Sequence, residues 1–153
     1  MLLTLDIGNT RAKLVSFVDG HPRLEAACAV SELPAAFAGI AAHRPEVTSL
    51  RWCSVGADDA LVEILLARTG WPTRRLVAAA EVGGVRLAYR TPHTLGVDRL
   101  AAVLGARSLQ PQGHLLVIDA GTCITFDVLL ADGRYIGGNI SPGLSMRLAA
   151  MHA

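Results

Sequence analysis

A strand-and-turn pattern that occurs twice limits most strongly what this 153-residue chain can fold into. With a shift of 113 positions, Leu2–Gly8 aligns without a gap with Leu115–Gly121, and Asp19-Gly20 falls on Asp132-Gly133. Each copy starts with an apolar run typical of a buried strand and continues through a glycine turn to a second strand and an Asp-Gly turn. Two units with the same internal spacing predict a duplicated domain.

The duplication predicts matching structure at both places. Leu2–Val18 and Leu115–Leu130 are expected to form superimposable antiparallel hairpins, each at the start of a sheet. Val15 falls on Val128, so the ungapped alignment extends into the second strand. Residues 1–112 are therefore predicted to form a first domain and residues 113–153 the beginning of a second. The alternative is that two hairpins of one α/β protein are similar only in composition.

The segments between the two copies predict an α/β protein. The chain is 52% hydrophobic and 18% charged, which is typical of a packed globular protein. Residues 80–95 are poorly periodic and contain Gly83-Gly84 and Pro92, which favours a functional loop over a core element. Periodicity and capping signals predict helices at 31–43 (capped by Ser31), 58–69, 98–109 and from 144 onward, and strands at 47–55 and 74–77.

Charge and cysteine content argue against several classes of function. The formal net charge is +1 and the 14 Lys and Arg residues form no basic run, so no surface for nucleic acid is indicated. Cys28, Cys53 and Cys123 lie far apart in the sequence, which argues against a zinc site or a disulfide framework. Neither a signal segment nor an apolar run of membrane-spanning length is present. We expect a cytoplasmic protein that binds neither nucleic acid nor membranes.

The turn after the first strand of each copy carries residue types that bind nucleotide phosphates. A glycine two residues after the strand-end Asp permits a sharp turn and lets backbone N–H groups approach phosphate oxygens, while hydroxyl and amide groups add donors. The Asp itself suits a hydrated Mg²⁺ ion. Two such loops facing each other across a cleft would hold one nucleotide. These residues are Asp6, Gly8, Asn9 and Thr10 in the first copy and Asp119, Gly121, Thr122 and Thr125 in the second.

Other interpretations of the same turns stay open. Asp6 and Asp119 could be turn carboxylates that cap their own backbone. Lys13 can add a positive charge at the first loop, or it can be a solvated lysine at the edge of a strand. Gly137-Gly138 and Pro142-Gly143 bracket a predicted loop, in which glycines either allow close approach of a ligand or only serve a turn.

A second candidate site lies where the predicted helix 98–109 begins. Asp98 opens this helix beside a glycine-rich segment, so its carboxylate could accept a hydroxyl proton during phosphoryl transfer. Arg99 could bind a carboxylate or the transferring phosphate. The alternative is that Asp98 only stabilises the positive N-terminus of the helix while Arg99 points to solvent. From the residues alone, this alternative is favoured.

Four ordered motifs cover most of the chain. They are Asp6-Ile-Gly-Asn-Thr10, Gly96-Val-Asp-Arg99, Asp119-Ala-Gly-Thr122 with Thr125, and Gly137-Gly-Asn-Ile-Ser-Pro-Gly143 followed by Met146. In order and spacing, these motifs resemble those of the type III pantothenate kinases. The resemblance implies an actin-like fold of two ribonuclease H-like domains. It also implies a cytoplasmic, homodimeric transferase that phosphorylates pantothenate with ATP in the first step of coenzyme A biosynthesis, with Mg²⁺ and a monovalent cation, K⁺ or NH₄⁺.

The resemblance further implies roles for single residues. Asp119 is similar to the family's monovalent-cation ligand, and Thr122 to a second ATP contact. Tyr89 is similar to a substrate contact, although on its own it is more typical of a packed aromatic residue. The pantothenate-binding element would consist of Gly96, Val97, Asp98 and Arg99, with Asp98 as proton acceptor. The first ATP phosphate loop would consist of Asp6, Ile7, Gly8, Asn9, Thr10, Arg11, Ala12 and Lys13.

Family members continue well beyond the Pro-Gly loop, which implies a complete first domain and a truncated second domain here. We therefore do not expect full catalytic activity from this chain alone. Two other functions stay open: an accessory factor in transcriptional activation built on the same fold, and another actin-like sugar, acid or polyphosphate enzyme that uses the same ATP loops. The absent basic patch argues against the first, and acceptor screening would identify the second.

Overall fold

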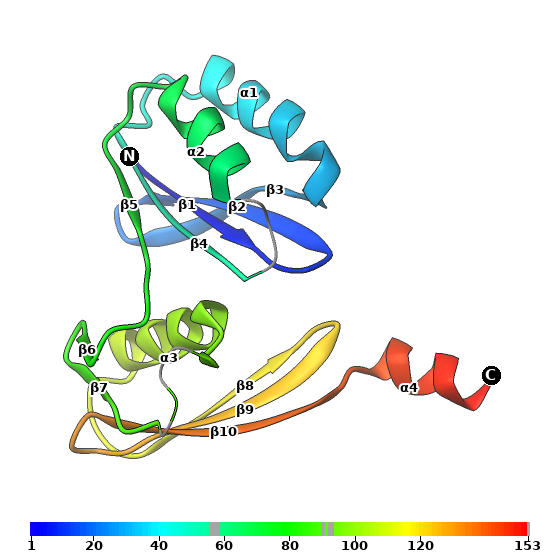
Figure 1. Cartoon of the computed structure of the whole chain (residues 1–153). Helices are drawn as coiled ribbons and strands as arrows, with labels where there is room; N and C mark the ends of the chain where they lie inside the picture. Colours follow the sequence, from blue (N-terminus) through cyan, green and yellow to red (C-terminus); the bar gives the residue numbers. More distant parts are fainter. Residues whose placement is uncertain (56–58, 90, 92–93, 153) are drawn as a thin grey trace. The chain divides into compact units, whose positions relative to one another are not determined.

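The computed structural model of this chain describes residues 1–55, 59–89, 91 and 94–152. The chain divides into two compact units, Met1–Val77 and Ala78–Ala153, and each is described by itself. Each unit contains one five-stranded sheet, together with α-helices (Figure 1). The α/β class predicted from the sequence is confirmed.

The first sheet has the strand order β3-β2-β1-β4-β5. Its opening is an antiparallel meander of β1, β2 and β3, and β4 and β5 extend the sheet in parallel on the other side of β1. Asp19 and Gly20 have φ angles of 51° and 80° and form the two-residue hairpin turn that the sequence predicts. The strands are β1 (Leu2–Ile7), β2 (Arg11–Val18), β3 (His21–Ala29), β4 (Ser49–Ser54) and β5 (Thr73–Arg75).

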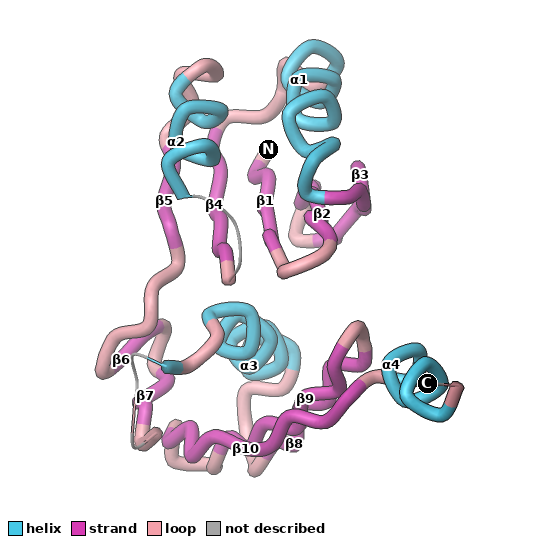
Figure 2. Tube along the Cα trace, turned by 45° about the vertical axis from the view of Figure 1, so that its right-hand side comes forward, coloured by secondary structure: helices cyan, strands magenta, loops and turns pink. Residues whose placement is uncertain are grey.

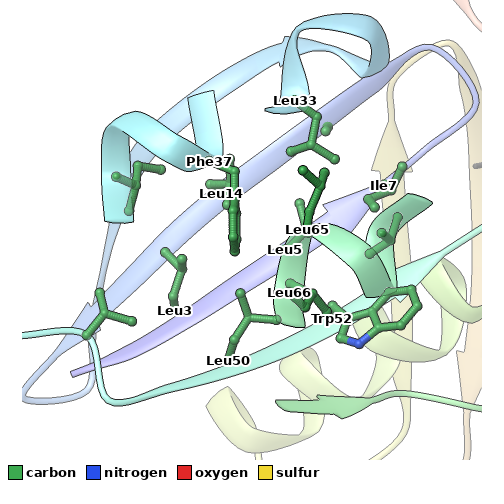
Figure 3. Close-up of a cluster of buried hydrophobic side chains, with 14 residues drawn as sticks. Leu3, Leu5, Ile7, Leu14, Leu33, Phe37, Leu50, Trp52, Leu65 and Leu66 are labelled. Carbon is green, nitrogen blue, oxygen red and sulfur yellow. The ribbon is translucent and has the colours of Figure 1, made fainter. Parts of the chain in front are cut away.

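Two helices, α1 (Leu33–His43) and α2 (Asp59–Ala67), cover one face of this sheet (Figure 2). Leu3, Leu5 and Ile7 of β1 face the helices and are at most 2% exposed, because successive strand residues point to opposite faces. Figure 3 shows these side chains packed against residues of both helices and of β4. Each such leucine or isoleucine contributes about 1.5–3 kcal/mol when it leaves water, so this layer stabilises the strand that carries Asp6.

The second sheet has the strand order β6-β7-β10-β9-β8. It contains an antiparallel meander of β8, β9 and β10, beyond which β10 pairs in parallel with β7. Helix α3 packs on β8 and β9. The elements are β6 (Glu81–Val82), β7 (Val85–Leu87), α3 (Val97–Leu109), β8 (Leu115–Ala120), β9 (Cys123–Leu129), β10 (Arg134–Pro142) and α4 (Leu144–Met151).

The two predicted hairpins are both present and antiparallel, but their first turns differ in length. Ile7 pairs with Ala12 across the turn between β1 and β2. Ala120 pairs with Ile124 across the corresponding turn between β8 and β9. The turn at 121–123 is therefore one residue shorter than the turn at 8–11. Strand β9 is displaced by one residue relative to the ungapped alignment.

A longer second turn restores the spacing. Val18 pairs directly with His21 after a two-residue turn, whereas the Leu130 N–H donates to the carbonyl of Arg134 across residues 131–133. The ungapped alignment is therefore correct for β1 and β8 and again after the second turn. Along β2 and β9 it is wrong by one residue. By pairing, Val15 corresponds to Asp127 and not to Val128, because Val15 lies opposite Thr4 and Asp127 lies opposite Val117.

Strand β8 corresponds to β1 but has different surroundings. Leu116 and Ile118, which align with Leu3 and Leu5, are 62% and 55% exposed. Whereas β1 lies between β2 and β4, β8 is the last strand of its sheet, and within the described part of the second unit no strand pairs with its outer edge. The second unit thus keeps the apolar pattern of β1 without the layer that buries it in the first unit.

Several sequence predictions of irregular structure are corrected. Residues 80–95 contain the hairpin β6–β7, because Gly83 and Gly84 adopt φ angles of 57° and 77° and close a two-residue turn. The loop expected at 137–143 lies mostly within β10, and β3, the strand implied by the predicted hairpin turn at Asp19-Gly20, had no predicted bounds. Helix α1 begins after Glu32, without the expected side-chain cap from Ser31. Asp58, Arg90, Pro92 and His93 of the predicted elements lie outside the described residues.

The compact units divide earlier than the sequence repeat does. The repeat begins near residue 113, whereas the second unit begins at Ala78. The reason is that β6 and β7 belong to the second sheet and α3 packs on β8 and β9. These elements precede the repeat in the sequence but fold with its second copy.

Candidate active site

The first candidate loop is the turn between β1 and β2. Gly8 donates its N–H to the carbonyl of Arg11 at 2.9 Å, which closes the turn. Asn9, Thr10 and Lys13 are exposed around it. Lys13 lies opposite Asp6 in the strand pair, and directly opposed residues project from the same face of a sheet. The loop therefore offers exposed hydroxyl and amide groups together with a cation and a carboxylate on one face.

The remaining members of this loop have structural side chains. Ile7 and Ala12 are fully buried in the core, so a ligand could meet them only through their backbone. Arg11 donates from Nη2 to the carbonyl of Ala27 at 3.0 Å, which ties the turn to β3. The Asp6 Oδ1 atom accepts a hydrogen bond from Sγ of Cys53 at 3.4 Å. The predicted phosphate loop thus combines the buried Ile7 and Ala12 and the bonded side chains of Arg11 and Asp6 with an exposed polar rim.

The second candidate loop is the turn between β8 and β9. Gly121 donates its N–H to the carbonyl of Cys123 at 2.8 Å, and Gly143 donates to the carbonyl of Thr122 at 2.9 Å. A side chain at Gly143 would collide with the carbonyls of Gly121 and Thr122. Asp119 and Thr122 are exposed. The Pro142-Gly143 segment therefore packs against this loop and bonds to it. The close contact is a structural reason for glycine at position 143.

The partner of the strand-end Asp differs between the two loops. Asp6 lies opposite Lys13, whereas Asp119 lies opposite Thr125. Because opposed side chains share a face, the first loop has a cation beside its carboxylate and the second has a hydroxyl group. Negative charge at the second loop is not offset by its cross-strand neighbour.

Asp98 lies in the first turn of α3. Its Oδ1 atom accepts the N–H of Arg99 at 2.8 Å, and its side chain is half-buried. A β-carbon added to Gly96 would lie 2.5 Å from this oxygen, so a side chain at position 96 would force the Asp98 carboxylate to shift. One oxygen of Asp98 thus stabilises the helix N-terminus, and Oδ2 takes no part in that bond. Both sequence interpretations of Asp98 are compatible with this geometry.

Arg99 is buried, so the interpretation that it points to solvent is wrong. Its Nε donates to both carboxylate oxygens of Asp127, at 3.0 and 3.1 Å, and its Nη2 donates to Oδ1 at 2.5 Å. Burial disfavours the charged guanidinium, but the hydrogen bonds and charge of Asp127 outweigh this and raise the pKa of Arg99. Arg99 therefore stays charged within a complete ion pair.

Tyr135 completes this buried group. It is fully buried in β10 and donates its hydroxyl to Oδ1 of Asp127. Burial, reinforced by the hydrogen bond to Asp127, raises the pKa of Tyr135, so the phenol keeps the proton that it donates. Sequence reasoning singled out neither Asp127 nor Tyr135, although an acidic residue inside the apolar run 126–130 was a usable signal.

Tyr89 lies beside a hollow of about 390 Å³ whose described lining includes Ala88, Thr91 and Ile136. Its ring rests on Gly137, where an added β-carbon would lie 2.5 and 2.7 Å from ring atoms. The backbone N–H of Ala88, the residue before Tyr89, donates to the carbonyl of Tyr135 at 2.9 Å. The second unit therefore brings together Tyr89, the start of α3 and the buried group formed by Arg99, Asp127 and Tyr135. No cluster of three or more His, Cys, Asp or Glu side chains suited to a metal occurs among the residues that the structure covers.

Comparison with known proteins identifies the family. A family model described as type III pantothenate kinase matches residues 2–153. The chain belongs to this family. Type III pantothenate kinases of Porphyromonas gingivalis and Flavobacterium johnsoniae are 39% and 36% identical to it over 98% and 99% of its length, and it covers 60% and 62% of theirs. The chain thus spans less than two thirds of the length of these type III pantothenate kinases.

Shorter and more distant matches agree. The type III pantothenate kinase of Phocaeicola vulgatus is 61% identical over 64 residues, which are 42% of this chain and 26% of that protein. A crystal structure of the Ppx/GppA phosphatase of Aquifex aeolicus, type II variant, matches with a TM-score of 0.54 at 14% identity, over 98% of this chain and 54% of that one. At this identity the likeness concerns the fold alone, and it confirms the actin-like fold. None of the described helices has the length and apolar character needed to cross a membrane.

Proposed function

We propose that the full-length protein phosphorylates pantothenate to 4′-phosphopantothenate with ATP, the first step of coenzyme A biosynthesis. The observation that carries this proposal is the match of the type III pantothenate kinase family over residues 2–153. The structure supports it, because three of the four motifs lie on turns and at a helix start whose polar groups suit phosphoryl transfer, while the fourth lies mostly within β10. The comparisons give no support to a role as a transcription accessory factor. We further propose a cytoplasmic homodimer.

In this proposal the loop 6–13 binds the phosphates of ATP. Asn9, Thr10 and Lys13 are exposed around this turn, and donors at such turns bind phosphate oxygens. Asp6 fits a hydrated Mg²⁺ ion, which needs few carboxylates and keeps several waters. A bound Mg²⁺ would neutralise phosphate charge as it develops. Thr122 is proposed as a further ATP contact.

Asp98 is the proposed proton acceptor for the primary hydroxyl of pantothenate. Its Oδ1 atom is occupied by the N–H of Arg99, which orients the carboxylate and leaves Oδ2 to take the proton. General-base catalysis by a positioned carboxylate contributes roughly 10²–10⁴-fold to rate. The backbone of Gly96 and Val97, the guanidinium of Arg99 and the hydroxyl of Tyr89 form the proposed surroundings of the substrate.

Asp119 is the proposed ligand of a monovalent cation, K⁺ or NH₄⁺. Its carboxylate is exposed, and its cross-strand neighbour is Thr125 and not a lysine. Carboxylate, hydroxyl and carbonyl oxygens are the ligand types that such hard cations accept. A bound cation would supply positive charge beside the phosphates. The contrast with Asp6, which already faces Lys13, supports different tasks for the two loops.

The test of the function is direct product detection. Full-length protein, ATP, MgCl₂ and KCl are incubated with pantothenate, and phosphopantothenate and ADP are measured by mass spectrometry and a coupled assay. Equal amounts of both products support the proposal. A panel of sugars and carboxylic acids serves as the specificity control. ADP formation with one of these acceptors and none with pantothenate would identify a different actin-like kinase.

Replacing Asp6 by Asn is expected to lower kcat/KM for ATP roughly tenfold or more, because the site loses charge that holds Mg²⁺-ATP. The amide keeps the shape of the carboxylate and can still accept the bond from Cys53. Steady-state kinetics at varied ATP measures the effect. Asp19→Asn, at the exposed turn between β2 and β3, is the control. An unchanged rate for Asp6→Asn would make Asp6 a structural turn residue.

Replacing Asp119 by Ala is expected to abolish activation by K⁺. Initial rates are measured in KCl, NH₄Cl and NaCl at constant ionic strength, so that screening does not change between the samples. Asp132→Ala is the matched control, since Asp132 is an exposed carboxylate of the same unit that pairs with Arg134 at 2.7 Å. If the parent protein is equally active in NaCl alone, the cation assignment fails.

A further inference from the structure

Arg99 and Asp127 are the charged residues that are buried in the described part of the chain, at 7% and 1% exposure. Taking two charges out of water is costly and is repaid only when the pair has good geometry and its remaining lone pairs are satisfied. Here both conditions hold, because Asp127 accepts bonds from Nε and Nη2 of Arg99 and from the hydroxyl of Tyr135. A buried ion pair whose hydrogen bonds are satisfied fixes the position of the elements that carry its residues.

The element that it holds is the start of α3. Gly96 is the N-cap residue, and it provides no side-chain bond to the helix. The first bond of the helix, from the N–H of Leu100 to the carbonyl of Gly96, is long at 3.4 Å. The helix therefore begins with a weak backbone bond and no side-chain cap. By contrast, the side chain of Arg99 connects the turn to β9 and β10 through several short bonds.

This connection acts next to the proposed base. The N–H of Arg99 donates to Oδ1 of Asp98 at 2.8 Å, so a shift of Arg99 would move the carboxylate as well. The bonds to Asp127 use Nε and Nη2 of Arg99 and do not involve Nη1. A guanidinium has five donors in a fixed fork, so Arg99 can keep this pairing and still present donors to an anionic substrate group.

We propose that Asp127, held in place by Tyr135, is a positioning residue for phosphoryl transfer: it fixes Arg99 and thereby the turn 96–99 that carries Asp98. The proposal rests on the proposed role of Asp98 as base. Asp127 does not touch the substrate and exchanges no proton. Its carboxylate orients the guanidinium, and the guanidinium holds the first turn of the helix against the sheet.

Tyr135→Phe and Asp127→Asn in the full-length protein test the proposal. Tyr135→Phe removes one hydroxyl and keeps the buried ring, and it is expected to lower kcat/KM for pantothenate about threefold to tenfold, as for loss of one hydrogen bond to a charged group. Asp127→Asn removes the charge and is expected to cost about a hundredfold. The KM for ATP should stay within twofold in both variants. If Asp127→Asn does not fold, Tyr135→Phe decides.

Amide hydrogen exchange provides a readout that does not depend on activity. In Tyr135→Phe, the amides of Arg99 and Leu100 are expected to exchange about tenfold faster, while amides near residue 107 at the other end of α3 keep the parent rate. Ser108→Ala is the control, because it removes a hydroxyl that donates to Gly105 at that far end. It should change neither the exchange near Arg99 nor the kinetics with pantothenate.

The possible outcomes separate this proposal from the proposed function. Faster exchange in the first turn, with a loss confined to pantothenate, supports the positioning role. Unchanged exchange in Tyr135→Phe, or an equal loss toward ATP and pantothenate, overturns it. If the parent protein makes no phosphopantothenate, the proposed function fails, and the exchange rates still decide whether Asp127 and Tyr135 hold this turn.

Discussion

Asp98→Asn in the full-length protein is expected to lower kcat with pantothenate about a hundredfold or more, the contribution of a positioned general base. The amide oxygen can still accept the N–H of Arg99, now at 2.8 Å from Oδ1, so the first turn of α3 keeps its structure. The amide cannot take the proton of the substrate hydroxyl. The KM for ATP should hardly change, because the phosphates are assigned to other loops. Steady-state kinetics with each substrate varied in turn measures both effects.

Asp132→Asn is the matched control for this change. It makes the same substitution in the same unit, at an exposed hairpin residue that bonds to Arg134. The parent kcat is expected. A kcat of Asp98→Asn within about threefold of the parent value would leave Asp98 only the task of stabilising the helix N-terminus, which is worth about 0.3–1 kcal/mol at an exposed site.

Gly138→Ala is expected to destabilise the second unit by about 3 kcal/mol or more, near the top of the range for steric overpacking. Gly138 lies opposite Asp127 in the β9–β10 pair. A β-carbon at this position would overlap the carbonyl of Phe126, so the two strands would have to separate. Because Tyr135 and Asp127 lie on these strands, the ion pair of Arg99 would be disturbed as well. Thermal unfolding followed by circular dichroism measures the change in Tm.

Gly105→Ala provides the opposite expectation in the same unit. Gly105 lies within α3, and no atom within 4 Å would meet its added β-carbon. Alanine is about 1 kcal/mol more favourable than glycine inside a helix, so Tm should rise slightly. Equal Tm values for Gly138→Ala and the parent protein would show that β10 can move away from β9 without cost.

The strands with clear apolar alternation could be predicted from the sequence. Leu3, Leu5 and Ile7 alternate with partly exposed residues, and this pattern located β1 correctly. Strand β3 has no such pattern, because most of its residues at this sheet edge are exposed. Strand β10 contains Gly137-Gly138, which is typical of loops. Its glycines are explained by close approach of other parts of the chain, which a sequence does not display.

The sequence predicted the single motifs of the candidate site. It did not predict which side chains of other elements they contact. Asp98 and Arg99 were recognised at a helix start, yet the partner of Arg99 depends on which residues of β9 face α3. In β9, Ile124, Phe126 and Val128 alternate with Thr125, Asp127 and Leu129, so an acid stands at a buried position beside the buried Leu129. A buried carboxylate requires a cationic partner. The one-residue difference between the turns hid this position, because the ungapped alignment matched Val15 with Val128.

The outer edge of β8, which pairs with no strand in the described part of the second unit, affects how the chain behaves in solution. Its segment Leu-Leu-Val-Ile-Asp-Ala, residues 115–120, is short, β-prone and carries a single charge, and Leu116 and Ile118 are exposed beside free backbone groups. Such strands serve as templates for pairing with other polypeptides. Refolding of this chain therefore competes with aggregation, and the yield of monomer should fall as protein concentration rises.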